Sequence, residues 1–356
     1  MVVCYHFTWE LLGARYPILR NPVTAWFLNG DFAVSIFFVL SGIALTSGYF
    51  TNGDRRILVG LAVKRYSRLT IPILVTCFLT FALYQLGLTY CGSASVVVAR
   101  PDWIGSWLSE PVTLLRWAQY SLAEVYIIRN HTTALNAFLW TMQVEMWASF
   151  AIFAGLLARN ARDYIWITLI LAFAIAGLSI EIHPFVLFGF GAAFSFATSR
   201  RGAATLTGHR LCQVSALAIM TIVAAIQSWA HVNGANEAIA AYSAIAFVYA
   251  ALTSRPFRAL LELPVSRFLG RISLNLYLLQ FPVMISFSAA SLVWLSRTGS
   301  FSFTAAMLVS AASIVICIVL ALLMTPLDNL TQRVGAIILS IYDDLSGDHQ
   351  ESWRPE

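Results

Sequence analysis

Long runs of apolar residues alternate with short polar connections along most of the chain. Most runs approach the ~20 residues that an α-helix needs to cross the roughly 30 Å hydrocarbon layer of a bilayer. A helix also satisfies its own backbone hydrogen bonds inside lipid. The pattern predicts an all-α fold, a polytopic membrane helical bundle with about ten transmembrane helices. The predicted spans are 1–12, 32–50, 70–88, 138–157, 163–181, 184–198, 212–230, 237–254, 272–294 and 303–325.

Two stretches depart from this pattern. The first run, 1–12, is too short to span a bilayer, so the first transmembrane helix is expected to be truncated. The connection 89–137 is rich in tryptophan and tyrosine, which favour the headgroup zone. We expect part of it to form a helix that lies on the membrane surface.

The composition excludes a soluble protein. Of the 356 residues, 59% are hydrophobic and only 11% are charged, whereas soluble domains usually carry about 25% charged residues. The five cysteines show no metal-type spacing, so no metal site is predicted. We expect an integral multi-pass membrane protein, located in the inner membrane if its source is bacterial.

The basic residues are distributed unevenly between the connections. Of the 22 Lys and Arg residues, 16 fall in one alternating set of connections and 6 in the other. Cytoplasmic connections carry the excess of Lys and Arg in membrane proteins, so both termini are predicted to be cytoplasmic. This placement accounts for the net charge of +5 without a nucleic-acid partner. We expect a transmembrane domain over 1–335 and a short cytoplasmic tail over 336–356.

Ionisable side chains inside apolar runs are costly and are therefore candidates for function. His6 lies in the first run and could act as a base near neutral pH. Glu145 lies inside another run, 138–157, with no adjacent Lys or Arg. A carboxylate there must be neutral, paired or facing water. The plainer alternatives are a buried histidine bonded to a neighbouring helix and a purely structural polar link.

Two further pairs of polar residues are candidates for binding. Arg65 and Arg68 are three residues apart and would share one helix face. Their guanidinium groups could hold phosphates bidentately, although they could equally anchor the cytoplasmic end of a span. Asn275 and Gln280 place two amides in the predicted span 272–294, where packing between helices is the alternative to a polar cavity.

Five short segments carry a family resemblance when they are taken in order. They are Tyr-His-Phe at 5–7, the stretch 30–42 ending in Phe-Phe-Val-Leu-Ser-Gly, the Arg-rich run 64–72 ending in Ile-Pro, Leu-Trp-Thr-Met-Gln-Val-Glu at 139–145, and the stretch 270–282 ending in Tyr-Leu-Leu-Gln-Phe-Pro. Together they resemble the acyltransferase-3 family of multispanning membrane O-acyltransferases. Two positions depart from the family pattern: Ser35 replaces a usual acidic residue, and Gln280 replaces a usual histidine.

The resemblance implies a membrane-bound acyltransferase. It would move an acyl group, expected to be acetyl, from cytosolic acyl-CoA to a hydroxyl of a glycan, a lipid-linked sugar or a small molecule. Acyl-CoA would be a cosubstrate, and no permanently bound cofactor is implied. By the same resemblance His6 would be the catalytic base or acyl relay, and Glu145 would orient a partner or the acceptor. Arg65 and Arg68 would hold the phosphates of the donor.

The residues expected to bind the acceptor or to line the cavity are Ser41, Trp140, Asn275, Tyr277 and Gln280. The predicted topology places the arginine pair at the cytoplasmic face and Glu145 nearer the opposite face, with a buried site between them. Two alternatives remain at this point. One is a transporter or flippase of a lipid-linked or acylated saccharide, and the other is a catalytically inactive relative.

Overall fold

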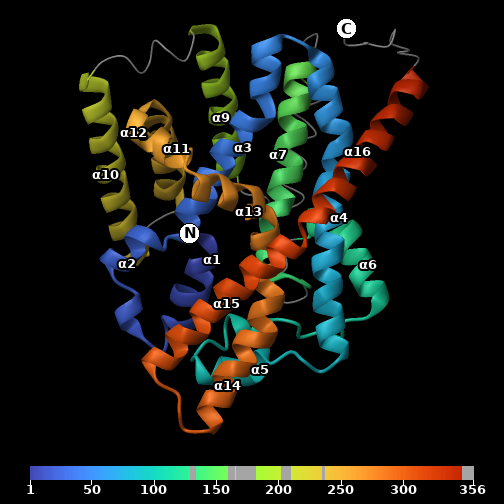
Figure 1. Ribbon diagram of the computed structural model, residues 1–356. Helices are drawn as coiled ribbons and strands as arrows, with labels where there is room; N and C mark the ends of the chain where they lie inside the picture. The colour runs from blue at the N-terminus through green and yellow to red at the C-terminus, as the bar shows by residue number, and fades with distance from the viewer. Residues whose placement is uncertain (129–133, 159–164, 166–181, 202–209, 235–236, 347–356) are drawn as a thin grey trace.

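The computed structural model describes residues 1–128, 134–158, 165, 182–201, 210–234 and 237–346, and every regular element within these ranges is helical. Figure 1 shows the helices gathered into one bundle, in which most of the long helices run between the same two ends. The predicted all-α bundle is confirmed. The predicted span 163–181 lies, apart from residue 165, outside the described residues.

Seven helices in the described part of the chain are long and apolar enough to cross a membrane. They are Pro22–Asn52 (α2, Pro22–Phe27, with α3, Gly30–Asn52), Arg55–Gln85 (α4), Ala137–Leu157 (mainly α7, Trp140–Leu157), Ile182–Ser199 (in α9, Ile182–Arg201), Ser215–Val232 (in α10, Arg210–Val232), Pro264–Arg297 (α13, Pro264–Val283, with α14, Ala289–Arg297) and Phe303–Leu323 (α15). Each overlaps one predicted span. The predicted span 237–254 corresponds to α11 (Glu237–Thr253), whose apolar part is shorter than the others. The chain is an integral multi-pass membrane protein.

Helix α4 begins much earlier than the sequence pattern suggests. The predicted span was 70–88, but the helix starts at Arg55, where the Asp54 side chain accepts a hydrogen bond from the backbone N–H of Arg56 at 2.8 Å. The preceding helix, α3, ends at Asn52 and is followed by Gly53, whose positive φ of 73° suits glycine. The connection is therefore only two residues long, and most of the predicted loop 51–69 is helix.

Two glycines allow helices α3 and α9 to pack with their backbones in close approach. A Cβ atom on Gly42 would lie 2.2 Å from the backbone oxygen of Phe188, and one on Gly191 would lie 2.1 Å from that of Val39. Small residues at such crossings are typical of helix packing in membranes. The contact fixes the part of α3 that carries Ser41.

The first predicted run forms a short helix that enters the middle of the bundle. Helix α1 (Val2–Tyr5) continues into a π-helical turn over His6–Glu10, closed by a bond from the Leu11 N–H to the His6 carbonyl. The N-terminus lies near the centre of the bundle in Figure 1. Turns of this kind occur frequently at functional sites.

The long connection between α4 and α7 folds against one end of the bundle and contains α5 (Cys91–Val97) and α6 (Leu114–Leu122). Three of its aromatic side chains pack inward: Trp107, Tyr120 and Tyr126 are at most 5% exposed. The Tyr126 hydroxyl forms a hydrogen bond with Oγ1 of Thr70 at 2.8 Å. Burial raises the pKa of this hydroxyl above its usual range, so it stays protonated. The aromatic residues thus tie the connection to α4.

Helix α16 (Thr325–Ser346) follows α15 and runs beside α4 (Figure 1). The predicted boundary between the domain and the tail, at 335 and 336, falls inside this helix. Gly335 faces the side chain of Lys64, and a Cβ there would lie 3.3 Å from the lysine Cγ. The glycine therefore allows α16 to lie close to the α4 side chain.

Candidate active site

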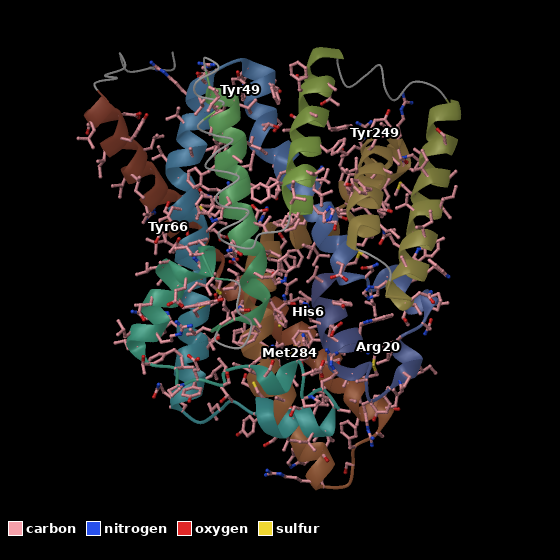
Figure 2. The ribbon with its side chains drawn as sticks, turned by 180° about the vertical axis from the view of Figure 1, so that it is seen from behind. His6, Arg20, Tyr49, Tyr66, Tyr249 and Met284 are labelled. Atoms are coloured by element: carbon pink, nitrogen blue, oxygen red, sulfur yellow. The ribbon has the colours of Figure 1, made fainter. Side chains whose placement is uncertain are left out.

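His6 lies in the interior of the bundle (Figure 2). Its Nδ1 is 3.0 Å from Oε1 of Gln280 on α13, a side chain that is fully buried. With the amide oxygen facing the ring, Nδ1 is the donor of this hydrogen bond, and this placement assigns the ring proton to Nδ1. Nε2 then keeps its lone pair and is the ring atom able to take up a proton. The imidazole stacks on Phe138, with 4.0 Å between the ring centroids and 8° between the planes.

Neighbouring helices hold both members of this stack in place. Ser310 of α15 donates a 2.7 Å hydrogen bond to the backbone carbonyl of Phe7, beside the histidine. The backbone of Phe138 is held twice: its N–H donates to Oδ1 of Asn136 at 3.0 Å, and its carbonyl accepts from the Tyr277 hydroxyl. The orientation of the imidazole is thus set by α13, α15 and the turn before α7.

A polar network lies beside the histidine on the side of the long connection. Trp103 is 6.2 Å from the imidazole, and the guanidinium of Arg100 lies 5.1 Å from a centroid of the indole. Arg100 also pairs with the carboxylate of Glu10 at 2.8 Å, and that carboxylate accepts a 2.6 Å hydrogen bond from the Tyr5 hydroxyl. This network links the helix that carries His6 to the long connection between α4 and α7.

Glu145 forms a buried ion pair with Arg65. Their side chains are 4% and 8% exposed, and Arg65 also donates to the backbone carbonyl of Glu145 at 3.3 Å. The Ser41 hydroxyl donates to the other carboxylate oxygen at 2.7 Å. Burying a single charge would be costly, so each partner makes the burial of the other tolerable. The pair joins α4 to α7, and Ser41 adds α3.

The expectation that Glu145 lies nearer the opposite face from the arginines was wrong, because Arg65 and Glu145 touch. The physical reason is the early start of α4, which carries Arg65 ten residues into the helix. A charge count treats an arginine as a marker of a loop, but an arginine paired with a carboxylate can lie within a helix bundle. The guanidinium of Arg65 is therefore already paired with the Glu145 carboxylate, whereas the phosphate-binding interpretation assumed an unpaired arginine.

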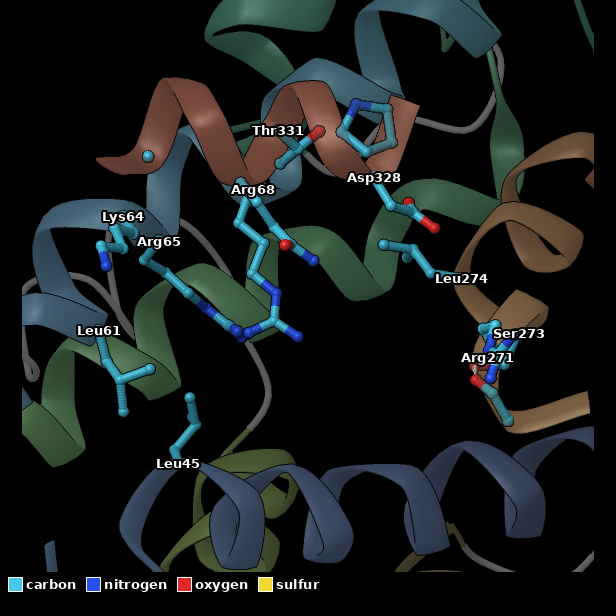
Figure 3. A pocket seen from close by; sticks show the side chains of 14 residues that line it. Leu45, Leu61, Lys64, Arg65, Arg68, Arg271, Ser273, Leu274, Asp328 and Thr331 are labelled. Carbon is cyan, nitrogen blue, oxygen red and sulfur yellow. Dashed lines mark hydrogen bonds between the residues drawn. The ribbon is translucent and has the colours of Figure 1, made fainter. Parts of the chain in front are cut away.

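A cavity of about 630 Å³ lies between α3, α4, α13 and α16. Its lining includes four basic side chains, Lys64, Arg65, Arg68 and Arg271. Figure 3 shows Arg65 and Arg68 directed into the cavity from α4, while Arg271 stands on the α13 side. No ion pair to another described residue is found for Lys64, Arg68 or Arg271. The cavity thus presents unneutralised positive charge, as expected for an anion-binding site.

The histidine and the cavity lie at different levels of the same helices. On α13, nine residues separate Arg271 at the cavity from Gln280 at the histidine, which is about 13 Å at 1.5 Å per residue. On the α7 side, seven residues separate Phe138 from Glu145, or about 10 Å. No hydrogen bond joins His6 to Glu145 among the described contacts. The two predicted catalytic residues therefore lie in two separate tiers of the bundle interior. One tier contains His6, Gln280 and Phe138, and the other contains Glu145, Arg65 and the cavity.

The structure places the other predicted residues between these tiers. The Tyr277 hydroxyl lies 2.9 Å from Oγ1 of Thr141, and Trp140 meets Phe38 edge-on at 6.4 Å between centroids. Asn275 is 1% exposed and donates to Oδ1 of Asp328 at 3.5 Å. Of the two amides, Asn275 thus bonds to a neighbouring helix, while Gln280 contacts the candidate base directly.

Sequence reasoning missed several residues of both tiers. Phe138 immediately precedes a segment recognised for its glutamate, and aromatic residues are too common in apolar runs to stand out. Lys64 and Arg271 lie in recognised segments, but they line one cavity only because α4 and α13 pack together. Asp328 follows the last apolar run and has no signal in the sequence that connects it to the arginines.

Comparison with known proteins defines the class of this fold and site. The family model for the acyltransferase-3 domain, described as an acyltransferase domain, matches residues 1–322 of the chain. Searches of characterised proteins and of solved structures gave no significant match. The helical bundle, with a half-buried histidine in its interior, is that of a membrane acyltransferase. The chain belongs to the acyltransferase-3 family, which favours the enzyme over the transporter alternative.

Proposed function

We propose that this protein transfers an acetyl group from acetyl-CoA to a hydroxyl of a glycan, a lipid-linked sugar or a small molecule. The observation that carries the proposal is the pairing of two features along α13. A cavity lined by basic side chains lies at the level of Arg271. About 13 Å further along the helix is Gln280, whose side chain forms a hydrogen bond with His6.

The cavity has the chemistry and the size to hold the phosphate groups of coenzyme A. Guanidinium groups bind phosphate oxygens through paired charge-assisted hydrogen bonds, and a lysine adds a point charge. The volume of about 630 Å³ falls in the range of small-molecule sites, ~300–1,000 Å³. Arg68 and Arg271 are the principal phosphate ligands in this proposal, together with Lys64. Arg65 lines the same cavity but is held by Glu145.

The histidine supplies the proton transfers of the reaction. Nε2 of His6 takes the proton of the acceptor hydroxyl as its oxygen attacks the carbonyl carbon of the thioester. The C–S bond then breaks, and the imidazolium returns the proton to the departing thiolate of coenzyme A. The product is an ester of the acceptor, and the histidine is neutral again. Gln280 holds the Nδ1 proton throughout, which keeps Nε2 as the reactive atom.

The first experiment measures transfer and donor binding separately in the purified protein in detergent. With radiolabelled acetyl-CoA we expect labelled acceptor, or slow hydrolysis of the thioester when no acceptor is present. His6→Ala is expected to lower the rate at least ~100-fold, in the range of lost acid–base catalysis, while the Kd for CoA stays within about twofold. His183→Ala on α9 is the matched control and should retain wild-type activity. Full activity of the His6 variant would show that the base is misassigned.

Arg68→Ala tests the donor site without breaking the Arg65–Glu145 pair. We expect the Kd for CoA to rise about tenfold, the size of one lost charge-assisted contact of ~1.4 kcal/mol. Arg297→Ala, an exposed arginine at the end of α14, should leave the Kd unchanged. Unchanged CoA affinity in the Arg68 variant would reduce that arginine to a topology anchor.

A further inference from the structure

One wall of the cationic cavity comes from outside the family-matched part of the chain. The match ends at residue 322, and α16 begins at Thr325. Four cavity-lining residues of α16 are Asp328, Thr331, Gln332 and Gly335. Their spacing of three, four and seven residues places them on one helix face. This wall of the cavity is thus a polar helix face that lies outside the matched residues.

Asp328 is the feature of this wall that phosphate binding alone does not explain. It is the one carboxylate among the described residues that line a cavity with four basic side chains. Figure 3 shows it on α16 among the side chains that line the cavity. Yet Asp328 forms no ion pair with Lys64, Arg68 or Arg271 within the described residues. The cavity is therefore lined by a carboxylate and by basic side chains that are not paired with it.

A buried amide holds this carboxylate in place. Asn275 is 1% exposed and donates from Nδ2 to Oδ1 of Asp328 at 3.5 Å. No described side chain donates to the second carboxylate oxygen, Oδ2. An ionised carboxylate can only accept hydrogen bonds, so Oδ2 is available to a ligand N–H or O–H group.

The two kinds of charge fit a ligand that has two kinds of group. A ligand made only of phosphates would be repelled by Asp328, and a neutral ligand would leave the cations unused. A nucleotide thioester carries phosphates together with amine, hydroxyl and amide hydrogens. It can satisfy both sides of the cavity at once.

We propose that Asp328 determines donor specificity by accepting a hydrogen bond from an uncharged N–H or O–H group of the coenzyme, while Lys64, Arg68 and Arg271 take its phosphates. This proposal rests on the proposed function, in which the donor occupies the cavity. It makes α16 a part of the donor site, and it makes Asp328 a selector for the complete coenzyme over simpler polyphosphates.

Asp328 also lies in the first turn of α16, where a carboxylate stabilises a helix through the helix dipole. That structural role predicts a lower thermal midpoint and an equal effect on all anions. Selection predicts a change in the ratio of affinities for two anions, which helix stabilisation does not produce. The ratio is therefore the decisive quantity.

The experiment measures Kd by calorimetry for three probes: CoA, adenosine 3′,5′-bisphosphate and inorganic pyrophosphate. The proteins are the wild type, Asp328→Ala, Asp328→Asn and the control Asp344→Ala, which removes an exposed carboxylate from the same helix. We expect Asp328→Ala to weaken CoA binding about tenfold, because CoA donates a hydrogen bond to the carboxylate. Pyrophosphate binding should be unchanged or tighter, because pyrophosphate makes no such bond and is repelled by the carboxylate. Asp328→Asn keeps an acceptor oxygen and should lose less than the alanine variant.

The nucleotide probe identifies the donating group. If adenosine 3′,5′-bisphosphate weakens together with CoA, the group is in the nucleoside, and if it does not, the group is in the pantetheine arm. Unchanged or tighter CoA binding by Asp328→Ala would overturn the selector, as would equal weakening of CoA and pyrophosphate. Absence of CoA binding by the wild type would overturn the proposed function itself, which is a distinguishable result.

Discussion

At the scale of single residues, the hydrogen bond between His6 and Gln280 orients the proposed catalytic base. By the resemblance described above, Gln280 stands where a histidine is expected, and an amide cannot take up a proton. The structure shows that the amide can still perform an orienting role, because its Oε1 lies 3.0 Å from Nδ1 of His6. The histidine is then the sole titrating group of the pair, and Gln280 acts through it.

Variants of Gln280 test this positioning role. Gln280→Leu removes the acceptor at similar size, so the Nδ1 proton is no longer held and Nε2 is the free base in only part of the population. We expect kcat to fall about tenfold or more, with little change in the Kd for CoA. Gln280→Glu keeps an acceptor oxygen and should retain more activity than the leucine variant. Equal kcat in the wild type and Gln280→Leu would contradict the role.

At the scale of helices, the Arg65–Glu145 pair is a joint between α4 and α7. Arg65→Met leaves a buried carboxylate without its partner and should destabilise the protein by about 3–5 kcal/mol. The double variant Arg65→Met with Glu145→Leu removes both charges and should unfold at a higher temperature than the single variant. Thermal unfolding in detergent measures both. Equal midpoints for the single and double variants would show that the two residues are not energetically coupled.

The crossing of α3 with α9 offers a second test at this scale. Gly42→Ala places a Cβ 2.2 Å from the Phe188 carbonyl oxygen, so the helices must separate, and we expect a lower thermal midpoint together with lower activity. Gly189→Ala is the matched control, because nothing lies within 4 Å of its Cβ position. If the two variants unfolded at the same temperature, close approach of the two backbones at Gly42 would not be needed for stability.

At the scale of the whole molecule, periodicity and length predicted the all-α membrane bundle well. Each of the seven long apolar helices of the described residues overlaps a predicted span, because the thickness of the bilayer sets the length of an apolar run that crosses it. The start of α4 was predicted poorly. Five basic residues between 51 and 69 suggested a loop, but all five are on one continuous helix.

The site was only partly predictable, for a physical reason. His6 and Gln280 were both recognised, yet nothing in the sequence shows that residues 274 positions apart share a hydrogen bond. Glu145 and Arg65 were separated by a topology argument that ignored pairing of buried charges. Asp328 lines the same cavity as the arginines only because α16 packs on α4. Contacts between distant helices depend on tertiary packing, which a single sequence does not display.

The most direct test of the account is an experimental structure of the full chain with acetyl-CoA bound to the His6→Ala variant. The account predicts that the phosphates lie between Arg68 and Arg271 in the cavity, and that the thioester extends along α13 toward the position of the missing imidazole. Coenzyme bound outside this cavity, or a thioester directed away from residue 6, would contradict it.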